Sequence, residues 1–374
     1  MKILFFTHYS KMLGANRSMI NLIEGLKEKG ISCTVFCPNH DELVDACEKI
    51  GVTCKVLPFH NDVYFMKGLS RAKGLIRHFK NSLAINRIEK EVKVEAPDII
   101  HTNTSAVFMG AKIAKKLGVP HIWHIREFGM EDYQMKHNLG SQYFFNLLNT
   151  SRHIICISKA IKQHFSTQLK APSSIIYNGV LWEKEMKPAP SPQSNPIVNF
   201  LIIGALKPEK GQMEAITAFT KVYQRNPNCA LTIVGDSPDN YMEVLKKQAK
   251  KLGVSEQVNF TGYTSNPSLY YETADCLLMC SKNEGMGRVT VEAMANGVPV
   301  IGYNGGATPE LVEEGRNGFL YKNEEELVEK MMFCMNNPSA KIELGKNGIA
   351  LAKEQFSIEK YAEKALKIYN HVLS

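Results

Sequence analysis

The sequence predicts an α/β protein built from two Rossmann-like domains, each a doubly wound parallel sheet, that face each other across a cleft. Three observations predict this class. The chain has 374 residues, a length that suits two domains better than one. Short apolar runs alternate with helical sequence, which is typical of strands buried on both faces of a parallel sheet. A proline-rich stretch interrupts this pattern, and the pattern then restarts.

In the first half of the chain, the expected strands are the apolar runs KILFFTHYS, SCTVFCP, PDIIHTN, PHIWHIRE, RHIICIS and SSIIYNG. A helix is expected from about Asn16, because apolar residues recur at helical spacing from Met19 to Leu26. Gly30 suits the end of that helix. Residues 1–186 are therefore predicted to form the N-terminal domain.

Residues 187–196, KPAPSPQSNP, read as a linker because they combine four prolines with two serines. Beyond it the expected strands are VNFLIIGAL, CALTIVGD, VNFTGY, ADCLLMCS and VPVIGYN, which place a second domain at 197–356. The tail, about 357–374, reads as an amphipathic helix that packs back on the first domain.

Composition narrows the possible partners. The formal charge of +8 and the pI of about 8.8 suit an anionic ligand or an anionic membrane surface, and they are too weak to argue for nucleic acid. The nine cysteines show no metal-ligand spacing, so we expect buried, reduced thiols in a cytoplasmic protein. The N-terminal apolar run is too short for a signal peptide, and no run reaches the ~18 apolar residues of a membrane span.

Polar clusters follow the expected strands, in THYSKMLGANRS, HIREFG, GALKPEKGQ, GDSPD and CSKNEGMGR. In a doubly wound sheet, ligands bind at the carboxyl ends of the strands. The last cluster continues into NEGMGRVTVEAMANG, which carries Glu284 and Glu292. On one helix these carboxylates would lie about 12 Å apart along the axis, too far for the pair of a glycoside hydrolase.

The glycines instead place Glu284 in a loop and start a helix near Arg288. No His or Asp lies nearby to complete a metal site. Two readings remain at this point. The stretch either grips a hydroxyl-rich or anionic ligand at a helix N-terminus, or it is a plain helix start with solvated acids.

The stretch EGMGRVTVEAMANGVPVIGYNGGATPELVEEGRNGFLY resembles the donor-binding region of retaining glycosyltransferases of family four, the group 1 glycosyl transferases. The frame of two glutamates separated by seven residues is intact, and YNGV, GALKPEKG, IVGDSP and VNFTGY also occur in family order. The resemblance covers nearly the whole chain. It implies the GT-B fold and a hexosyltransferase that moves a sugar from a nucleotide-sugar to a hydroxyl acceptor.

The resemblance implies roles for the second domain. Glu284 would contact the transferred sugar, Glu292 the ribose, and Lys210 the diphosphate, while the family arginine is replaced by Ala205. Lys207 or Arg288 would then have to compensate. We name His124, Glu284 and Lys210 as catalytic. The expected donor-binding residues are Gly14, Ala15, Lys207, Lys210, Tyr263, Glu284, Gly285, Met286, Gly287, Arg288, Val289 and Glu292.

In the first domain, the loop LGANRS stands where the family has a glycine-rich turn, with Gly14 matching and Ala15 in place of the second glycine. His124 in WHIRE matches the family's active-site histidine, which lies near the sugar and need not be a base. The expected acceptor-side residues are Asn16, Arg17, Arg126 and Glu127. For Asn16 and Arg17, ordinary capping and surface roles also remain open.

The implied mechanism is transfer with retention of configuration, in which the leaving phosphate accepts the acceptor's proton and no protein nucleophile is required. No metal or other cofactor is expected, because the chain lacks a DxD-type motif in a suitable loop and GT-B enzymes generally need none. Two alternatives stay open: a nucleotide-sugar epimerase of the same fold, and a nucleotide-sugar-binding module without turnover.

Residues 66–93 carry eight Lys or Arg against two Glu, a net charge of +6. Leu75, Ile76, Phe79, Leu83, Ile85 and Ile88 recur there at roughly helical spacing. Such a stretch either lies on an anionic membrane or packs as a solvated helix on the sheet. We expect a glycan or lipid-linked acceptor, a role in surface polysaccharide or glycoconjugate synthesis, and a cytoplasmic protein at the inner face of the cell membrane.

Overall fold

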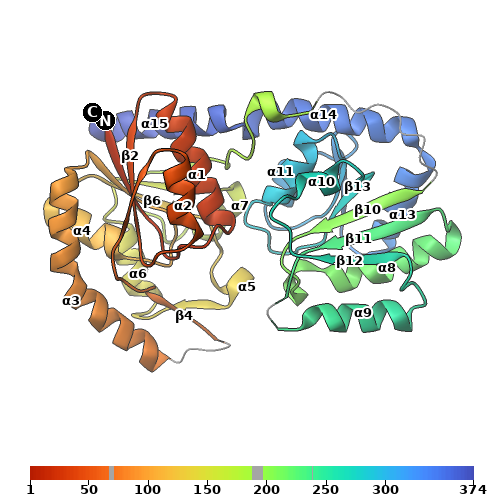
Figure 1. The fold of residues 1–374 in the computed structure, drawn as a ribbon, viewed down its shortest axis with the longest axis horizontal. Coiled ribbons are helices and arrows are strands. Elements are labelled where there is room, and N and C mark those ends of the chain that lie inside the picture. The colour runs from red at the N-terminus through yellow and green to blue at the C-terminus, as the bar shows by residue number, and fades with distance from the viewer. Residues whose placement is uncertain (67–70, 188–196, 238) are drawn as a thin grey trace. The chain divides into compact units, whose positions relative to one another are not determined.

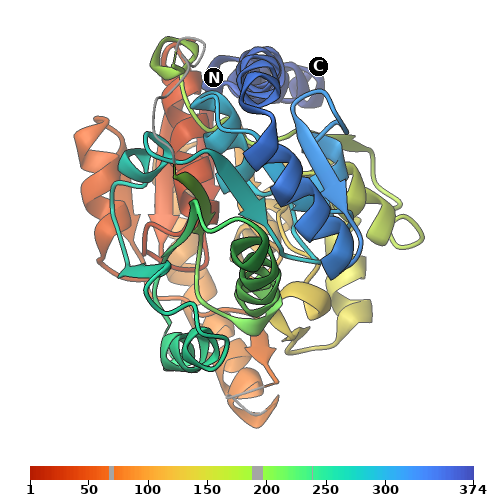
Figure 2. The same ribbon diagram turned by 90° about the vertical axis from the view of Figure 1, so that its right-hand side faces the viewer.

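A computed structural model describes residues 1–66, 71–187, 197–237 and 239–374. The chain divides into unit 1, Met1–Val180 with Ser357–Ser374, and unit 2, Leu181–Phe356. Each unit is an α/β sandwich with helices against its sheet (Figure 1 and Figure 2). Of the predicted linker, residues 188–196 lie outside the described residues.

Unit 1 contains a seven-stranded parallel sheet in the order β3-β2-β1-β5-β6-β8-β9. Its strands are β1 (Lys2–Phe6), β2 (Ser32–Cys37), β3 (Thr53–Val56), β5 (Ile99–Thr102), β6 (His121–Ile125), β8 (His153–Cys156) and β9 (Ser173–Ile175). A separate antiparallel pair joins β4 (Val63–Phe65) to β7 (Met135–His137). Its helices are α1 (Gly14–Lys27), α2 (Glu42–Lys49), α3 (Arg71–Glu95), α4 (Met109–Leu117), α5 (Met130–Tyr133), α6 (Ser141–Leu148), α7 (Lys159–His164) and α15 (Ile358–Leu373).

Strand β1 shows why unit 1 is doubly wound. Ile3 and Phe5 pack with α1 and α15, while Leu4 and Phe6 pack with α3 and α4. Side chains of a strand alternate between the two faces of a sheet, so a strand that is apolar throughout needs helices on both sides. Helix α1 ends at Lys27, and the left-handed Gly30 closes the turn after it, with its N–H donating to the Lys27 carbonyl at 2.8 Å.

Unit 2 contains a six-stranded parallel sheet in the order β12-β11-β10-β13-β14-β15. Its strands are β10 (Val198–Ile203), β11 (Cys229–Val234), β12 (Val258–Gly262), β13 (Cys276–Met279), β14 (Val300–Tyr303) and β15 (Gly318–Tyr321). Its helices are η1 (Glu183–Glu185), η2 (Pro208–Lys210), α8 (Gln212–Arg225), α9 (Tyr241–Lys251), α10 (Ser268–Tyr271), α11 (Arg288–Ala295), α12 (Thr308–Leu311), α13 (Glu324–Asn336) and α14 (Pro338–Phe356).

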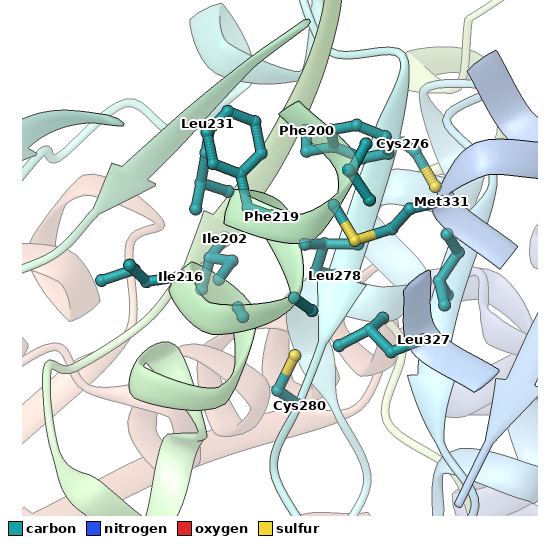
Figure 3. Packing of buried hydrophobic residues seen from close by; sticks show 14 of the residues in the cluster. Phe200, Ile202, Ile216, Phe219, Leu231, Cys276, Leu278, Cys280, Leu327 and Met331 are labelled. Atoms are coloured by element: carbon teal, nitrogen blue, oxygen red, sulfur yellow. The ribbon is translucent and has the colours of Figure 1, made fainter. Parts of the chain in front are cut away.

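The core of unit 2 lies between the sheet and helices α8 and α13. Phe219 of α8 and Met331 of α13 pack against Phe200, Leu231 and Leu278 of the sheet, and all five are buried (Figure 3). This close packing fixes the central strands, whose carboxyl ends carry the candidate site.

The domain boundary differs from the prediction. Residues 181–186 were assigned to the first domain, whereas the structure groups them with unit 2. Lys187 explains this, because its N–H donates to the Ala295 carbonyl at 3.1 Å and its amino group pairs with Glu272 at 2.9 Å. The chain therefore joins unit 2 before the prolines begin. It leaves unit 2 at Ser357, whose hydroxyl accepts from the N–H of Lys360 and caps α15.

Within the described ranges, no helix combines the length and the apolar character needed to cross a bilayer.

Candidate functional site

Lys210 and Glu284 meet beyond the carboxyl ends of β10 and β13 in unit 2. The amino group of Lys210, at the end of η2, lies 2.6 Å from Oε2 of Glu284. The side chains are 38% and 15% exposed, so water reaches the lysine while the carboxylate is largely enclosed. The structure thus brings together two residues that are 74 positions apart in sequence and that were both predicted as catalytic.

Two glycines make this approach possible. Gly211 has a φ of +73°, and a Cβ built on it would lie 2.5 Å from the Cys280 carbonyl oxygen. Gly306 has a φ of +56°, and its Cβ would lie 2.6 Å from the Glu284 nitrogen. Both positions therefore exclude a side chain. The neighbouring Ala307 N–H donates to the Glu284 carbonyl at 2.8 Å, which fixes the Glu284 backbone.

Glu292 lies on α11 and has two partners. Its Oε1 accepts from Nε of Arg288 at 2.9 Å, and its Oε2 accepts from the hydroxyl of Tyr271 at 3.0 Å. Burial and the adjacent Glu292 carboxylate raise the pKa of Tyr271 well above its usual value, so this phenol stays a hydrogen-bond donor. Tyr271 was not predicted from sequence, because an aromatic residue in a short helix gives no signal of such a contact.

Helix α11 begins at Arg288 after the left-handed Gly287, as the glycine spacing predicts. Glu284 lies in the preceding loop, so the two glutamates do not share a helix. The N–H groups of Thr290 and Val291 donate to the Gly287 carbonyl at 3.0 and 3.4 Å, and the start of the helix carries the positive end of the helix dipole. Gly285 and Val289 are half-buried, whereas Met286 is buried and offers only its backbone.

Two other donor-binding candidates, Lys207 and Tyr263, and the position of the missing family arginine, Ala205, lie near strand ends of unit 2. Ala205 follows β10 and is exposed, and its carbonyl accepts from Nε2 of Gln212. Lys207 is also exposed. Tyr263 follows β12 and its side chain is 66% exposed. Arg288 pairs with Glu292 at 2.9 Å, and both Arg288 and Lys207 remain predicted substitutes for the missing arginine.

In unit 1, Asn16 and Arg17 hold the loop between β1 and α1. Asn16 is buried, accepts from the Thr7 hydroxyl at 2.6 Å and donates to the carbonyls of Tyr9 and Lys11. Arg17 donates from Nε to the Met12 carbonyl at 2.9 Å. Both residues therefore bond within the loop, and Asn16 is buried rather than a cap or surface residue, while their acceptor-side role stays a prediction.

Gly14 opens α1 and is exposed, and Ala15 after it is half-buried. A Cβ on Gly14 would meet no atom within 4 Å, and its φ lies outside the left-handed region. The fold of unit 1 does not itself require a glycine at this position. The Ala15 carbonyl accepts from Nδ2 of Asn103 at 3.1 Å, which ties the start of α1 to the end of β5.

His124 and Arg126 form a polar cluster inside unit 1. His124 is fully buried in β6, and Nη2 of Arg126 donates to its Nδ1 at 3.2 Å. Burial, followed by the nearby charge of Arg126 and the ring of His101, lowers the pKa of His124 well below its usual value. His124 is therefore neutral at physiological pH, and a neutral imidazole does not act as a general acid.

Glu127 follows in the same loop, and its carboxylate is held by the segment after β5. Its Oε1 accepts from the Thr104 hydroxyl at 2.7 Å and from the N–H of Ser105 at 2.7 Å. The Ser105 hydroxyl donates to the same oxygen at 2.5 Å. Thr104 and Ser105 were missed by the sequence reading, since isolated hydroxyls carry no pattern.

Asp132, in the short helix α5 that follows, is a separate carboxyl, and burial raises its pKa to about 7.

Within residues 1–66, 71–187, 197–237 and 239–374, no three His, Cys, Asp or Glu side chains come together as metal ligands. The nine cysteines are unbridged, and all except the half-buried Cys54 are buried.

Comparison with known proteins assigns the family. The descriptions "Glycosyltransferase Family 4" and "Glycosyl transferases group 1" match residues 13–181 and 183–351. An uncharacterized glycosyltransferase of Methanocaldococcus jannaschii, MJ1178, is 30% identical over 292 residues, which cover 75% of this chain and 77% of that protein.

The chain belongs to the group 1 glycosyltransferases of the GT-B fold.

This glycosyltransferase also resembles the alpha-monoglucosyldiacylglycerol synthase of Acholeplasma laidlawii, at 24% identity over 95% of this chain and 93% of that protein. Among solved structures, Anabaena Alr3699/HepE in complex with UDP-glucose is 23% identical, with a TM-score of 0.82, covering 99% of this chain and 100% of that one. The predicted family, the two Rossmann-like sheets and the enzyme class are thereby confirmed. The roles of individual residues stay predictions.

Proposed function

We propose that this glycosyltransferase transfers a sugar from a nucleoside-diphosphate sugar to a hydroxyl acceptor with retention of anomeric configuration. The observation that carries the proposal is the joining of Lys210 and Glu284, 2.6 Å apart, beside the start of α11. A cation, a carboxylate and backbone N–H groups of a helix lie together at the carboxyl end of one sheet. The cation and the N–H groups suit a diphosphate, and the carboxylate suits the hydroxyl groups of a sugar. The complexes of Anabaena HepE with UDP and UDP-glucose support a donor of this class.

In the proposed reaction, the sugar–phosphate bond breaks and negative charge grows on the leaving diphosphate. Lys210 and the first-turn amides of α11 stabilise that charge. Glu284 holds hydroxyls of the transferred sugar, and Glu292 holds the ribose. The acceptor hydroxyl attacks from the face that the diphosphate leaves, and a phosphate oxygen takes its proton. No protein nucleophile and no metal ion are required.

We also propose a lipid-linked or other glycan acceptor that is reached at an anionic membrane surface through α3. Leu75, Ile76, Phe79 and Leu83 are 46–67% exposed, although they are apolar. Ile88, by contrast, is buried against the sheet. The names of two relatives support a lipid-linked acceptor. One is named alpha-monoglucosyldiacylglycerol synthase, and the other is a phosphatidylinositol monomannoside mannosyltransferase of Mycobacterium tuberculosis.

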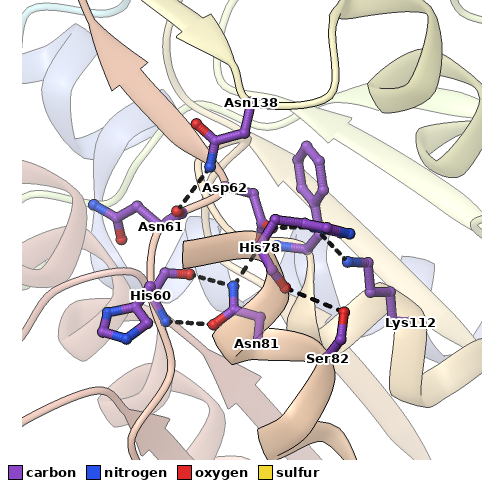
Figure 4. A network of polar contacts seen from close by, with 9 residues as sticks. His60, Asn61, Asp62, His78, Asn81, Ser82, Lys112 and Asn138 are labelled. Carbon is purple, nitrogen blue, oxygen red and sulfur yellow. Dashed lines mark hydrogen bonds and ion pairs between the residues drawn. The ribbon is translucent and has the colours of Figure 1, made fainter. Parts of the chain in front are cut away.

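The inner side of α3 is fixed by polar contacts that leave the exposed apolar residues facing away from the sheet. Asn81 is buried, accepts from the N–H of His60 at 2.7 Å and donates to its carbonyl at 2.8 Å (Figure 4). The buried carboxylate of Asp62 accepts from the N–H of Phe108 at 2.8 Å and lies 3.6 Å from His78 of α3. The helix is therefore anchored without using its apolar residues from 75 to 83.

Incubation with UDP-, GDP- and dTDP-sugars tests the function. A transferase releases free sugar and nucleoside diphosphate slowly in the absence of acceptor, because water replaces the acceptor hydroxyl. Formation of an epimeric sugar would instead identify an epimerase, and saturable binding without turnover a binding module. EDTA should leave the hydrolysis rate unchanged; loss of activity that Mg²⁺ restores would contradict the metal-independent mechanism.

A further inference from the structure

Glu292 is a largely enclosed carboxylate with a hydrogen-bond donor on each of its oxygens. Its side chain is 11% exposed. Oε1 accepts from Nε of Arg288 one helical turn earlier, and Oε2 accepts from the hydroxyl of Tyr271 on α10. In the part of the chain that the structure describes, each oxygen accepts this one hydrogen bond. The carboxylate therefore cannot turn about its terminal bond without breaking one of the two.

Tyr271 holds its end of this contact from a buried position. Its side chain is 3% exposed, and its hydroxyl lies 3.0 Å from Oε2 of Glu292 and 3.3 Å from the Val289 carbonyl oxygen. A phenol has a single proton, and a carboxylate is the stronger acceptor, so that proton points at Glu292. Burial, followed by the charge of Glu292, raises the pKa of Tyr271 well above its usual value, so the donor keeps its proton throughout the neutral range.

The segment that carries Tyr271 is tied to α11 by Lys187. The amino group of Lys187 pairs with Glu272, the residue after Tyr271, at 2.9 Å. The N–H of Lys187 donates to the carbonyl of Ala295, the last residue of α11, at 3.1 Å. The point at which the chain enters unit 2 therefore joins α10 to α11, the helix that carries Glu292.

The acceptor positions that remain on Glu292 match two neighbouring hydroxyl groups. An ionised carboxylate offers about four acceptor positions, two on each oxygen. Arg288 and Tyr271 take one on each oxygen, which leaves one on each. The 2′- and 3′-hydroxyls of a ribose can donate to both oxygens at the same time. A 2′-deoxyribose supplies only one of these donors, and the loss of a hydrogen bond to a charged group lowers the affinity.

We propose that Tyr271 is a positioning residue, which together with Arg288 orients Glu292 so that the site takes a nucleoside diphosphate with both ribose hydroxyls and discriminates against its 2′-deoxy form. The inference rests on the proposed function for the contact between Glu292 and the ribose. It narrows the donor to sugars of ribonucleotides, so dTDP-sugars should be the poorest donors among the three classes. All of the residues involved belong to unit 2.

Calorimetric titration of the full chain with UDP, GDP and their 2′-deoxy forms, dUDP and dGDP, tests the proposal without turnover. The wild type should bind the better of UDP and GDP at least about tenfold more tightly than its deoxy form, the scale for one hydrogen bond to a charged group. Tyr271→Phe keeps the ring and removes only the hydroxyl. It should weaken binding of the ribonucleotide about tenfold and of the deoxynucleotide less than about threefold, because the two changes are coupled through Glu292.

Kinetics with the accepted nucleotide-sugar give a second measurement. In Tyr271→Phe, KM should rise by about the same factor as the affinity falls, while kcat stays within about twofold. The ribose is bound equally in the ground state and in the transition state, because it lies outside the bond that breaks.

Tyr223→Phe is the control. Tyr223 belongs to α8 of the same unit, and its ring stacks on Phe219 with centroids 6.2 Å apart. This variant should bind all four nucleotides as the wild type does. Glu292→Gln should lose the discrimination as well, because an amide has one acceptor oxygen in place of two.

Three results would overturn the proposal: a wild type that binds ribo and deoxy forms equally, equal losses for both forms in Tyr271→Phe, or full discrimination in Glu292→Gln. Equal losses would mark Tyr271 as a purely structural residue. Discrimination in the wild type without release of sugar from any donor would reject the proposed transferase and leave this inference standing. If none of the four nucleotides bound, both would be rejected.

Discussion

At the scale of single residues, each glutamate of the frame already has a cation beside it. Glu284 pairs with Lys210, and Glu292 pairs with Arg288. The side chains of Glu284 and Glu292 are only 15% and 11% exposed, so a ligand that displaces their cations must itself satisfy the carboxylate oxygens. A diphosphate would replace Glu284 as the partner of Lys210, and hydroxyl groups of the donor would donate to the carboxylates. The pairs keep the four side chains oriented until a ligand binds.

Lys210→Ala should lower kcat for donor hydrolysis or transfer by at least ~100-fold, because the cation beside the leaving diphosphate is lost. Steady-state kinetics with the accepted nucleotide-sugar measure this. Lys246→Ala is the control, since Lys246 is exposed on α9 and pairs with Glu243 of the same helix. Activity near that of the wild type in Lys210→Ala would remove Lys210 from the mechanism.

At the scale of elements, loops rather than helices bring the site of unit 2 together. Gly211 lets the turn after β10 lie against the end of β13, and Gly306 lets the loop after β14 lie against Glu284. Each glycine combines a left-handed backbone with a contact that leaves no room for a Cβ. The strand order β10-β13-β14 makes these loops neighbours, because parallel strands all end at the same edge.

Gly306→Ala tests this arrangement against Gly253→Ala. Both glycines are left-handed, but a Cβ on Gly253 would meet no atom within 4 Å. Alanine at Gly253 should lower the free energy of unfolding by about 1 kcal/mol from backbone strain alone. At Gly306 the clash should add roughly 1–3 kcal/mol and also reduce kcat, because the backbone of Glu284 must move. Denaturant unfolding and kinetics of both variants measure the difference, and equal losses would contradict the argument.

The exposed apolar residues of α3 predict that the protein binds anionic membranes. The chain should float with anionic vesicles at low salt, and Phe79→Asp with Leu83→Asp should abolish this, since both side chains are more than 60% exposed and apolar. Val244→Asp on α9 of unit 2 is the control for adding a charge at an exposed apolar position. If the wild type shows no preference for anionic over neutral vesicles, α3 is only a solvated helix.

At the scale of the whole molecule, the titratable groups are distributed unevenly. All eleven histidines belong to unit 1, and His101, His121 and His124 are buried there. Burial lowers the pKa of His121 to about 3 and the pKa of the other two well below the usual value. The unfolded chain binds these three protons below about pH 6.5, whereas the folded unit does not. Asp132 acts in the opposite direction, because burial raises its pKa to about 7 and the folded state binds its proton first.

Unit 1 should therefore lose stability between about pH 6.5 and 4.5, because its histidines with a lowered pKa outnumber Asp132. Besides the three above, burial lowers the pKa of His8 to about 3 and of His137 to about 4, and it lowers the pKa of His60 and His153. Each proton of net uptake on unfolding corresponds to about 1.4 kcal/mol per pH unit. The variant Trp182→Phe leaves Trp123, in β6, as the single tryptophan that reports on unit 1. Its urea midpoint should fall on going from pH 7 to pH 5. Midpoints that stay equal would show that the buried histidines are not linked to folding.

Sequence pattern was enough to predict the α/β class, the family, most central strands and the position of Glu284 in a loop before α11. These follow from local pattern: apolar runs, glycine spacing and motif order. It missed the edge strands β3 and β15, because strands of four residues at a sheet edge give weak patterns. It also placed the domain boundary too late, since proline content marks a linker but not the packing of residues 181–187 before it.

Only the tertiary structure decided which side chains meet. The pairing of Lys210 with Glu284, the hold of Tyr271 on Glu292 and the contact from Tyr361 through Arg126 to His124 all join residues from separate elements. Sequence fixes the chemical type of each group, but distance, burial and hydrogen-bond direction arise only when strands and helices pack. Those three quantities decide that Asn16 bonds Thr7, Tyr9 and Lys11 around its own loop, and that His124 lies fully buried beside Arg126.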